Sequence, residues 1–292
     1  MSFISQLING LSIGSIYALI ALGYTMVYGI AKMLNFAHGD VIMIGAFSVF
    51  TAISSLHMNP MYAVLIGIIT CVTLGVLIEK IAYKPLRKAS PLTVLITAIG
   101  VSFLLQNIVL LIFGSTLKPF PSIMEVDSFK INENFSITGK SIITMVVTFI
   151  IMILLTLFIN KTKTGRAMLA VSEDRGAAEL MGVNVNKTIS ITFAIGSGLA
   201  AIAGVFYAST YGFIGPYSGS MPGIKAFIGA VLGGIGSIPG AMIGGILLGV
   251  VESLSKAYIS TELSDAIVFA VLIIVLIFKP SGLLGKNRTE KV

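Results

Sequence analysis

Long apolar runs alternate with short polar connections along almost the whole chain. Each run is continuous and rich in Leu, Ile, Val, Ala and Gly, whereas membrane β-barrels show short segments of alternating polarity. A bilayer-spanning helix needs about 20 mostly apolar residues. We predict helices over residues 4–30, 41–56, 61–82, 91–113, 141–160, 188–210, 224–235, 240–257 and 264–278. The pattern predicts an all-α, polytopic membrane protein of about eight to ten transmembrane helices.

The run at 224–235 is too short to cross a bilayer. At 1.5 Å per residue it reaches about 18 Å, against a hydrocarbon core of about 30 Å. Irregular backbone at that depth is tolerated only where protein or a wet cavity surrounds it. We therefore expect one or two discontinuous helices.

Composition excludes a soluble protein. Hydrophobic residues make up 56% of the chain and charged residues 11%, whereas soluble domains carry about 25% charged residues.

Residues 1–31 lack a basic start, and their apolar stretch is too long for a cleaved signal peptide. The single cysteine, Cys71, lies inside an apolar run and allows neither a disulfide framework nor a CxxC metal site.

The distribution of Lys and Arg predicts an external N-terminus, because cytoplasmic connections carry the excess of basic residues. This orientation places fourteen of the 19 basic residues inside and accounts for the net charge of +7 without nucleic acid. The inner set is Lys32, Lys80, Lys84, Arg87, Lys88, Lys161, Lys163, Arg166, Arg175, Lys187, Lys279, Lys286, Arg288 and Lys291. The outer set is Lys118, Lys130, Lys140, Lys225 and Lys256.

An internal repeat runs through the single predicted membrane domain, residues 1–292. The pattern Ile-Gly-Ser-x-x-Ala-x-Ile-Ala occurs at 13–21 and again at 195–203, and residues 74–83 are echoed in order by 248–258. An odd number of spans separates the two copies, so they cross the membrane in opposite directions. Inverted repeats with interrupted helices are a recurring plan of transporters.

The two repeats extend over about 4–113 and 141–279. The interruption that follows the first span, residues 32–40, lies inside in this topology, and its counterpart, 212–223, lies outside.

A basic, amphipathic segment at 164–184 lies between two spans on the inner side. Apolar residues at helical spacing predict a helix, and Gly182 is a candidate C-terminal cap. One interpretation is a surface helix on lipid headgroups, and the favoured one is a helix that docks in a groove of a partner protein. The segment from Gly176 to Gly182 resembles the EAA-x-x-x-G motif of ABC-transporter permeases, with Gly176 in place of the Glu.

Polar residues at membrane depth are candidates for a substrate pathway, because they are costly there. The motif LNFAHGD (34–40) holds Asn35, His38 and Asp40, and its other interpretation is a polar loop in which Asn35 or Asp40 caps the next helix. Gln106 and Asn107 lie inside the fourth span, and we expect them to face the protein interior.

A glycine-rich segment, 233–240, contains Gly233, Gly234 and Gly236. It lacks the Lys-Ser/Thr of a phosphate-binding loop, so nucleotide binding is not expected there. The spacing Gly236-x-x-x-Gly240-x-x-x-Gly244 favours close helix packing. The same glycines are also candidates to line the pathway, where bare backbone and a helix end can address a carboxylate.

Glu79 and Glu252 occupy corresponding places in the two repeats, near the ends of spans. Each either reaches the interface or has a functional role. Lys80 and Lys256 are their candidate partners.

The chain as a whole resembles the Liv-type permeases of branched-chain amino-acid ABC transporters. The resemblance rests on LNFAHGD (34–40), TAIGVSFLLQN (97–107), TGRAMLAVSEDRGAAELMGVN (164–184), KAFIGAVLGGIGSIPGAMIGG (225–245) and KPSGLLG (279–285). Asp40 stands where the family often has Glu. The residues it implies for contact with the ATPase are Thr164, Gly165, Arg166, Glu173, Asp174, Arg175, Ala177, Ala178 and Gly182.

The resemblance implies an importer in a bacterial inner membrane. Its other components are cytoplasmic ABC ATPase subunits, a second homologous permease and an external substrate-binding protein. The chain lacks G-x-x-x-x-G-K-[ST], so ATP hydrolysis is expected on a separate subunit. We expect no catalytic residue, cofactor or metal site in this chain.

Three alternatives stay open from the sequence. A permease of the same family for urea, amides or other neutral amino acids would share these motifs. A stand-alone secondary transporter or channel would leave 164–184 without a partner. An intramembrane serine protease is disfavoured, because Ser218 and His38 are predicted on opposite faces.

Overall fold

The computed structural model describes residues 3–87, 89–123, 126, 129–132 and 135–285. Four basic residues that the sequence places on the inner side lie outside the described residues: Lys88, Lys286, Arg288 and Lys291.

All nine predicted segments are helices. They are α1 (Phe3–Ala31), α2 (His38–Ser54), α3 (Pro60–Ile78), α4 (Pro91–Phe113), α5 (Gly139–Lys161), α8 (Val185–Tyr211), α9 (Ser220–Gly233), α10 (Ile238–Tyr258) and α11 (Ser264–Phe278). A π-helical turn, η1 (Glu79–Tyr83), continues α3. Six of the described helices are long and apolar enough to cross a membrane. The prediction of an all-α polytopic membrane protein is confirmed.

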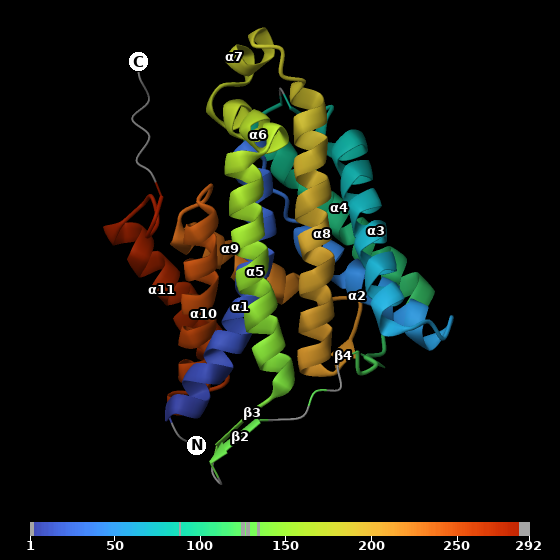
Figure 1. Ribbon diagram of the computed structural model, residues 1–292, viewed down its shortest axis with the longest axis vertical. Helices are drawn as coiled ribbons and strands as arrows, with labels where there is room; N and C mark the ends of the chain where they lie inside the picture. Colours follow the sequence, from blue (N-terminus) through green and yellow to red (C-terminus); the bar gives the residue numbers. More distant parts are fainter. Residues whose placement is uncertain (1–2, 88, 124–125, 127–128, 133–134, 286–292) are drawn as a thin grey trace.

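The remaining elements mark the two ends of the bundle (Figure 1). At one end lie α6 (Lys163–Glu173) and α7 (Arg175–Leu180), and this is called the α6–α7 end. At the opposite end lie the hairpin of β2 (Phe129–Asn132) and β3 (Phe135–Ile137) and the short pair of β1 (Lys118–Pro119) and β4 (Phe213–Ile214). This is called the hairpin end.

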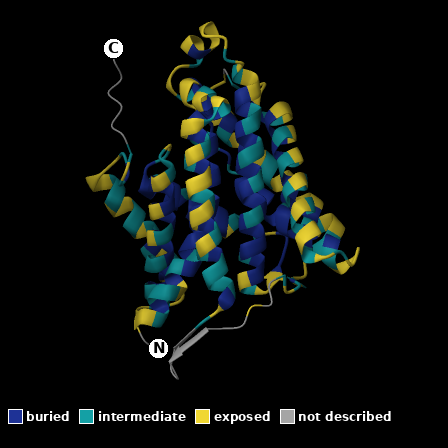
Figure 2. Ribbon diagram, in the orientation of Figure 1, coloured by how far each residue is buried: buried dark blue, intermediate teal, exposed yellow. Residues whose placement is uncertain are grey.

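The helix at the centre of the bundle is α1, and its described residues are mostly buried (Figure 2). By contrast, α3, α4 and α5 bury only a narrow face, and large apolar side chains such as Leu111 and Phe149 are exposed on them. Exposed apolar side chains on a water-soluble protein would cost free energy, whereas lipid is as apolar as they are. The outer helices are thus suited to a lipid environment.

Helix packing follows the repeat seen in the sequence. The echoes lie on α1 and α8 and on α3 and α10, and α1 and α8 run in opposite directions (Figure 1). In the first copy α1 packs against α10 and α9 of the second copy. In the second copy α8 packs against α3 and α2 of the first copy, so each copy makes the equivalent contacts with the other. This arrangement is the one expected of inverted repeats. The boundaries 4–113 and 141–279 stay a prediction.

Three of the nine described apolar helices, α2, α9 and α11, are shorter than the rest, and two of them, α2 and α9, start inside the bundle. The 14 residues of α9 reach about 21 Å, which agrees with the prediction of a half-length helix. Residues 32–37 and 212–219 are the irregular segments that precede α2 and α9. The predicted interruptions, 32–40 and 212–223, were therefore slightly too long, since Asp40 and Gly223 already belong to the helices.

Glycines allow α9 and α10 to pack at backbone contact distance. Gly240 and Gly244 of α10 lie against Gly233 and Gly229 of α9, and a Cβ atom at either position would collide with backbone. The predicted packing role is confirmed for these two residues. It is wrong for Gly236, which lies in the turn before α10 with φ 97° and contacts little.

The segment KPSGLLG closes one end of α9. The amides of Leu283 and Leu284 donate to the carbonyls of Leu232 and Gly233, at 2.8 and 2.9 Å. The last carbonyls of a helix have no partner within it, so this return of the chain satisfies two of them.

Candidate functional site

The candidate site is a polar cluster at the point where α2 and α9 begin. The backbones of Gly39 and Gly219 touch there, and a Cβ on either would collide with the backbone of the other. Gly223 also lies against Gly39. Two helix N-termini therefore meet inside the bundle with only peptide backbone between them.

Asp40 lies in the first turn of α2 and is 2% exposed. The amide nitrogen of Gln106, from α4, donates to its carboxylate at 2.9 Å and also contacts Ser220 at the start of α9 and Ser102, each at 3.2 Å. A helix N-terminus carries a partial positive charge that stabilises a carboxylate. We call Gly39, Asp40, Gln106, Gly219 and Ser220 the helix-crossing cluster.

Asn35 and His38 lie beside this cluster but do not cap α2. The helix begins after Ala37 without a side-chain cap, so the interpretation of Asn35 or Asp40 as the cap is wrong. Asn35 instead accepts a hydrogen bond of 3.0 Å from the Tyr83 hydroxyl. His38 is buried and packs edge-on against Tyr24, with 4.6 Å between ring centroids.

Asn107 does not face the interior, contrary to expectation. It is exposed, and its amide donates to the Phe103 carbonyl of its own helix at 2.7 Å. Successive helix residues point about 100° apart, so Gln106 and Asn107 cannot both face the same neighbour. Asn107 lies outside the helix-crossing cluster.

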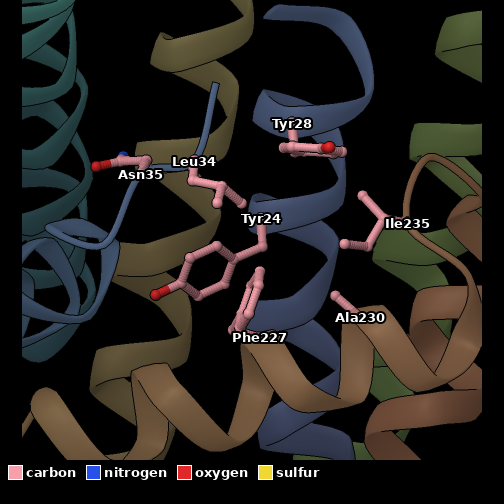
Figure 3. A pocket seen from close by; sticks show the side chains of 7 residues that line it. All are labelled: Tyr24, Tyr28, Leu34, Asn35, Phe227, Ala230 and Ile235. Atoms are coloured by element: carbon pink, nitrogen blue, oxygen red, sulfur yellow. The ribbon is translucent and has the colours of Figure 1, made fainter. Parts of the chain in front are cut away.

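A crevice lies near the cluster, between α1, α9 and the segment 32–37. Two aromatic rings from different helices, Tyr24 and Phe227, pack against one another at its wall, with 5.7 Å between centroids (Figure 3). It has no room for a water molecule in this conformation. We call it the inner crevice, and its lining residues are Tyr24, Tyr28, Leu34, Asn35, Phe227, Ala230 and Ile235.

Of the three glycines predicted for the pathway, none lines the inner crevice, although Ile235 does. Gly233 packs on Gly240, and Gly234 has φ 103° and lies against Gly282 and Gly285 of the returning chain. These glycines shape the turn beside the crevice.

The segment 164–184 forms two helices instead of the single helix that we expected. Asp174 leaves the helical conformation with φ −150° and ψ 116°, and its carboxylate caps α7 by accepting from the Ala177 amide at 3.0 Å. Gly182, with φ 83°, follows α7 as predicted for a C-terminal cap. The backbone amides of Gly182 and Val183 donate to the carbonyls of Glu179 and Ala178, which completes a Schellman motif.

One face of this segment holds it to the bundle and the other is open. Gly165, Met168, Val171 and Ala178 are buried, and α6 packs on α5, α8 and α1. Thr164 is half-buried. The exposed residues are Lys163, Arg166, Leu169, Ala170, Glu173, Asp174, Gly176, Ala177, Glu179, Leu180, Met181 and Gly182. We call residues 163–182 the coupling segment.

Arg175 ties the coupling segment to the end of α1. Its guanidinium donates to the carbonyl of Ala31, the last residue of α1 and the one before the irregular segment 32–37. Burial, and secondarily the nearby Arg87, lower the pKa of Arg175 from its usual value, but an arginine stays charged in proteins.

The two repeat-related glutamates are both fully buried and paired. Glu79 pairs with Arg87 and accepts from Ser190 at 2.6 Å, whereas the expected partner Lys80 is exposed. Lys80 directly follows Glu79, and successive helix residues point about 100° apart, so the two side chains cannot both face the interior.

Glu252 has its expected partner, Lys256 (2.5 Å), and a second one in Lys225 (2.9 Å), which also bonds Asp265 (2.7 Å). These bonds join α9, α10 and α11. The site is completed by Tyr24 and Ser220, which the sequence did not single out, and by Tyr83, which belongs to the repeated segment 74–83. Of the three, only Ser220 lies inside a predicted interruption, 212–223.

The fold and the cluster define a multi-pass helical membrane protein in which two oppositely directed units bring short helices together inside the bundle, as transporters do. A family model described as "Branched-chain amino acid transport system / permease component" matches residues 6–276, and the chain belongs to this family.

Individual relatives agree over nearly their full length. The chain is 48% identical to the high-affinity branched-chain amino acid transport system permease protein LivH of Salmonella typhimurium, over 99% of this chain and 98% of the relative. It is 47% identical to LivH of Escherichia coli K12 and 46% identical to the permease protein BraD of Pseudomonas aeruginosa, with the same coverage.

Proposed function

We propose that the chain is the membrane-spanning permease subunit of an ATP-driven importer for branched-chain amino acids in a bacterial inner membrane. The observation that carries this proposal is the 48% identity to LivH over 98% of that protein's length. Similarity of this extent covers the helix-crossing cluster and the coupling segment together, so it is not confined to one motif.

The charge distribution supports an orientation with the N-terminus outside. Segments that the Lys and Arg bias assigns to the inner side, including the end of α5 and the start of α8, lie at the α6–α7 end (Figure 1). The α6–α7 end is then cytoplasmic and the hairpin end external.

The coupling segment is the contact for a cytoplasmic ATPase. Its apolar tip, Leu180 and Met181, is 91% and 84% exposed, and Arg166 and Glu173 on α6 are also exposed. An apolar tip rimmed by charge is suited to a groove on a partner protein. The chain has no phosphate-binding loop signature, so the ATPase is a separate subunit.

Movement of the ATPase reaches the pathway through Arg175. Its bond to Ala31 joins the coupling segment to the last residue of α1, and the irregular segment 32–37 leads from there to Asp40. A displacement of α7 therefore acts on the walls of the inner crevice, which is closed in this conformation. Substrate passes between the repeats by alternating access, received from an external binding protein, and a second permease completes the pathway.

The test is reconstitution of the chain with its second permease and ATPase subunits in vesicles, with binding protein outside and ATP inside. Labelled leucine should accumulate only when ATP, ATPase and binding protein are all present. Accumulation by the chain without the ATPase would point to a secondary transporter. Uptake of urea or an amide in place of leucine would point to another substrate.

A further inference from the structure

A second cavity lies at the hairpin end, away from the helix-crossing cluster. It has a volume of about 320 Å³ and lies between the ends of α1, α5, α8 and α10. Nine of its ten lining residues are polar, and Ile13 is the exception. We call it the outer cavity, and it is lined by Gln6, Asn9, Ser12, Ile13, Thr138, Lys140, Ser141, Thr210, Ser253 and Lys256.

The charges around the outer cavity do not balance. Lys256 and Lys225 share Glu252, and Lys225 also bonds Asp265. Two ammonium groups thus face two carboxylates. Lys140 adds a third ammonium, for which no carboxylate partner exists among the residues that the structure describes. Its Nζ atom is 3.5 Å from the carbonyl of Ser209, a long contact.

Lys140 lies in the first turn of α5, whose N-terminus forms one wall of the cavity. The first amides of a helix have no partner within it and carry a partial positive charge. The hydroxyls of Ser12 and Ser141 add hydrogen-bond donors around the same space. A half-buried ammonium, a helix N-terminus and two hydroxyls are together the donors that an oxyanion requires.

We propose that the outer cavity binds the carboxylate of an amino acid on its external side, as a first station before the helix-crossing cluster. The inference rests on the proposed function for the source of the amino acid. The side-chain oxygen of Asn9 is an acceptor for its ammonium group. With Ile13 the one apolar lining residue, the cavity recognises the part that all amino acids share and leaves the choice of side chain to other components.

The phosphate of an anionic lipid offers similar oxyanion chemistry. A lipid would also need a long apolar groove for its acyl chains, and Ile13 is the one apolar side chain among the lining residues. The cavity therefore favours a small solute over a lipid headgroup.

The experiment measures binding of labelled leucine to the full-length chain in nanodiscs of neutral phosphatidylcholine. Leucine should bind, and leucinamide, which lacks the carboxylate, should compete at least about tenfold more weakly, as loss of a charge-assisted hydrogen bond predicts. Lys140→Met should weaken leucine binding about tenfold or more, whereas Lys140→Arg should retain most of it. Lys118→Met, at the same end but outside the cavity, is the matched control.

Equal binding of leucine by the Lys140→Met and Lys118→Met variants would overturn the proposal. A second arm adds phosphatidylglycerol to the nanodiscs: if this lipid displaces leucine from the native chain and is itself retained through Lys140, the site belongs to a lipid and the amino-acid proposal is overturned. Because the readout is binding, import of leucine by the complete complex tests the proposed function separately.

Discussion

The guanidinium of Arg175 donates a hydrogen bond to the main-chain carbonyl of Ala31. The bond crosses from the coupling segment to the final residue of α1, 144 positions earlier in the sequence. A change at Arg175 therefore tests the proposed path from the ATPase to the inner crevice.

Replacing Arg175 with Ala should uncouple ATP hydrolysis from transport. A hydrogen bond of a charged group contributes about 1.5–3 kcal/mol, so we expect leucine uptake to fall about tenfold or more while the ATPase stays bound. Uptake and ATP hydrolysis are measured on the same vesicles. Lys187→Ala, an exposed basic residue at the start of α8, is the control and should change neither. Unaltered uptake in the Arg175→Ala complex would contradict this path.

Arg166→Ala and Glu173→Ala should weaken attachment of the ATPase, because both side chains lie on the exposed face of the coupling segment. Co-purification and uptake should fall together in the double variant. A double variant that retains its ATPase and transports normally would show that the docking surface lies elsewhere.

Backbone contact at the helix crossing predicts a sharp difference between glycines. Gly219→Ala places a methyl group on the backbone of Gly39, and overpacking of this kind costs about 1–3 kcal/mol. Gly100, on α4, has nothing within 4 Å of its Cβ position. Gly100→Ala should therefore be neutral or stabilising by up to about 1 kcal/mol. Thermal unfolding in detergent compares the two.

Two adjacent residues of α4 provide a similar contrast. Gln106→Leu removes the amide that bonds Asp40, and leaving a buried charged group without its partner costs about 1–3 kcal/mol or more. Asn107→Leu alters an exposed side chain that bonds only its own helix, and it should change stability by less than about 0.5 kcal/mol. Similar melting temperatures for the two variants would argue against the helix-crossing cluster.

The buried ion pair of Lys225 and Glu252 should be sensitive to removal of either member. Lys225→Met leaves Glu252 and Asp265 short of a cation and should destabilise the chain by about 3 kcal/mol. The side chain of Lys256 is 35% exposed, so Lys256→Met should lower the free energy of unfolding by less than about 1 kcal/mol. Adding Glu252→Gln to Lys225→Met should recover part of the stability, as measured by unfolding in detergent.

Periodicity and length predicted the helices well because each span is a long apolar run. The predicted bounds 91–113 and 264–278 are identical to those of α4 and α11. Contacts between segments that are distant along the chain could not be predicted from the sequence. Nothing local to Glu79 indicates Arg87, since the intervening π-helical turn changes which residues face inward. The break at Asp174 also escaped prediction, because its carboxylate competes with the helix by capping the next one.

Polar residues within spans correctly predicted residues of the candidate site only where the helix backbone is interrupted. Asp40 and Gln106 converge on the start of α9, but Asn107 finds an acceptor one turn away and needs no interior partner. The depth of a polar residue in the membrane was predictable from the sequence, and the direction in which it points was not.

The touching starts of α2 and α9 give the two halves of the molecule a common pivot. Each short helix extends from that point toward a different face of the bundle, so neither can swing without carrying the other's origin with it. In the proposed alternating access, this contact would make the two short helices move together, so that opening at one face accompanies closing at the other.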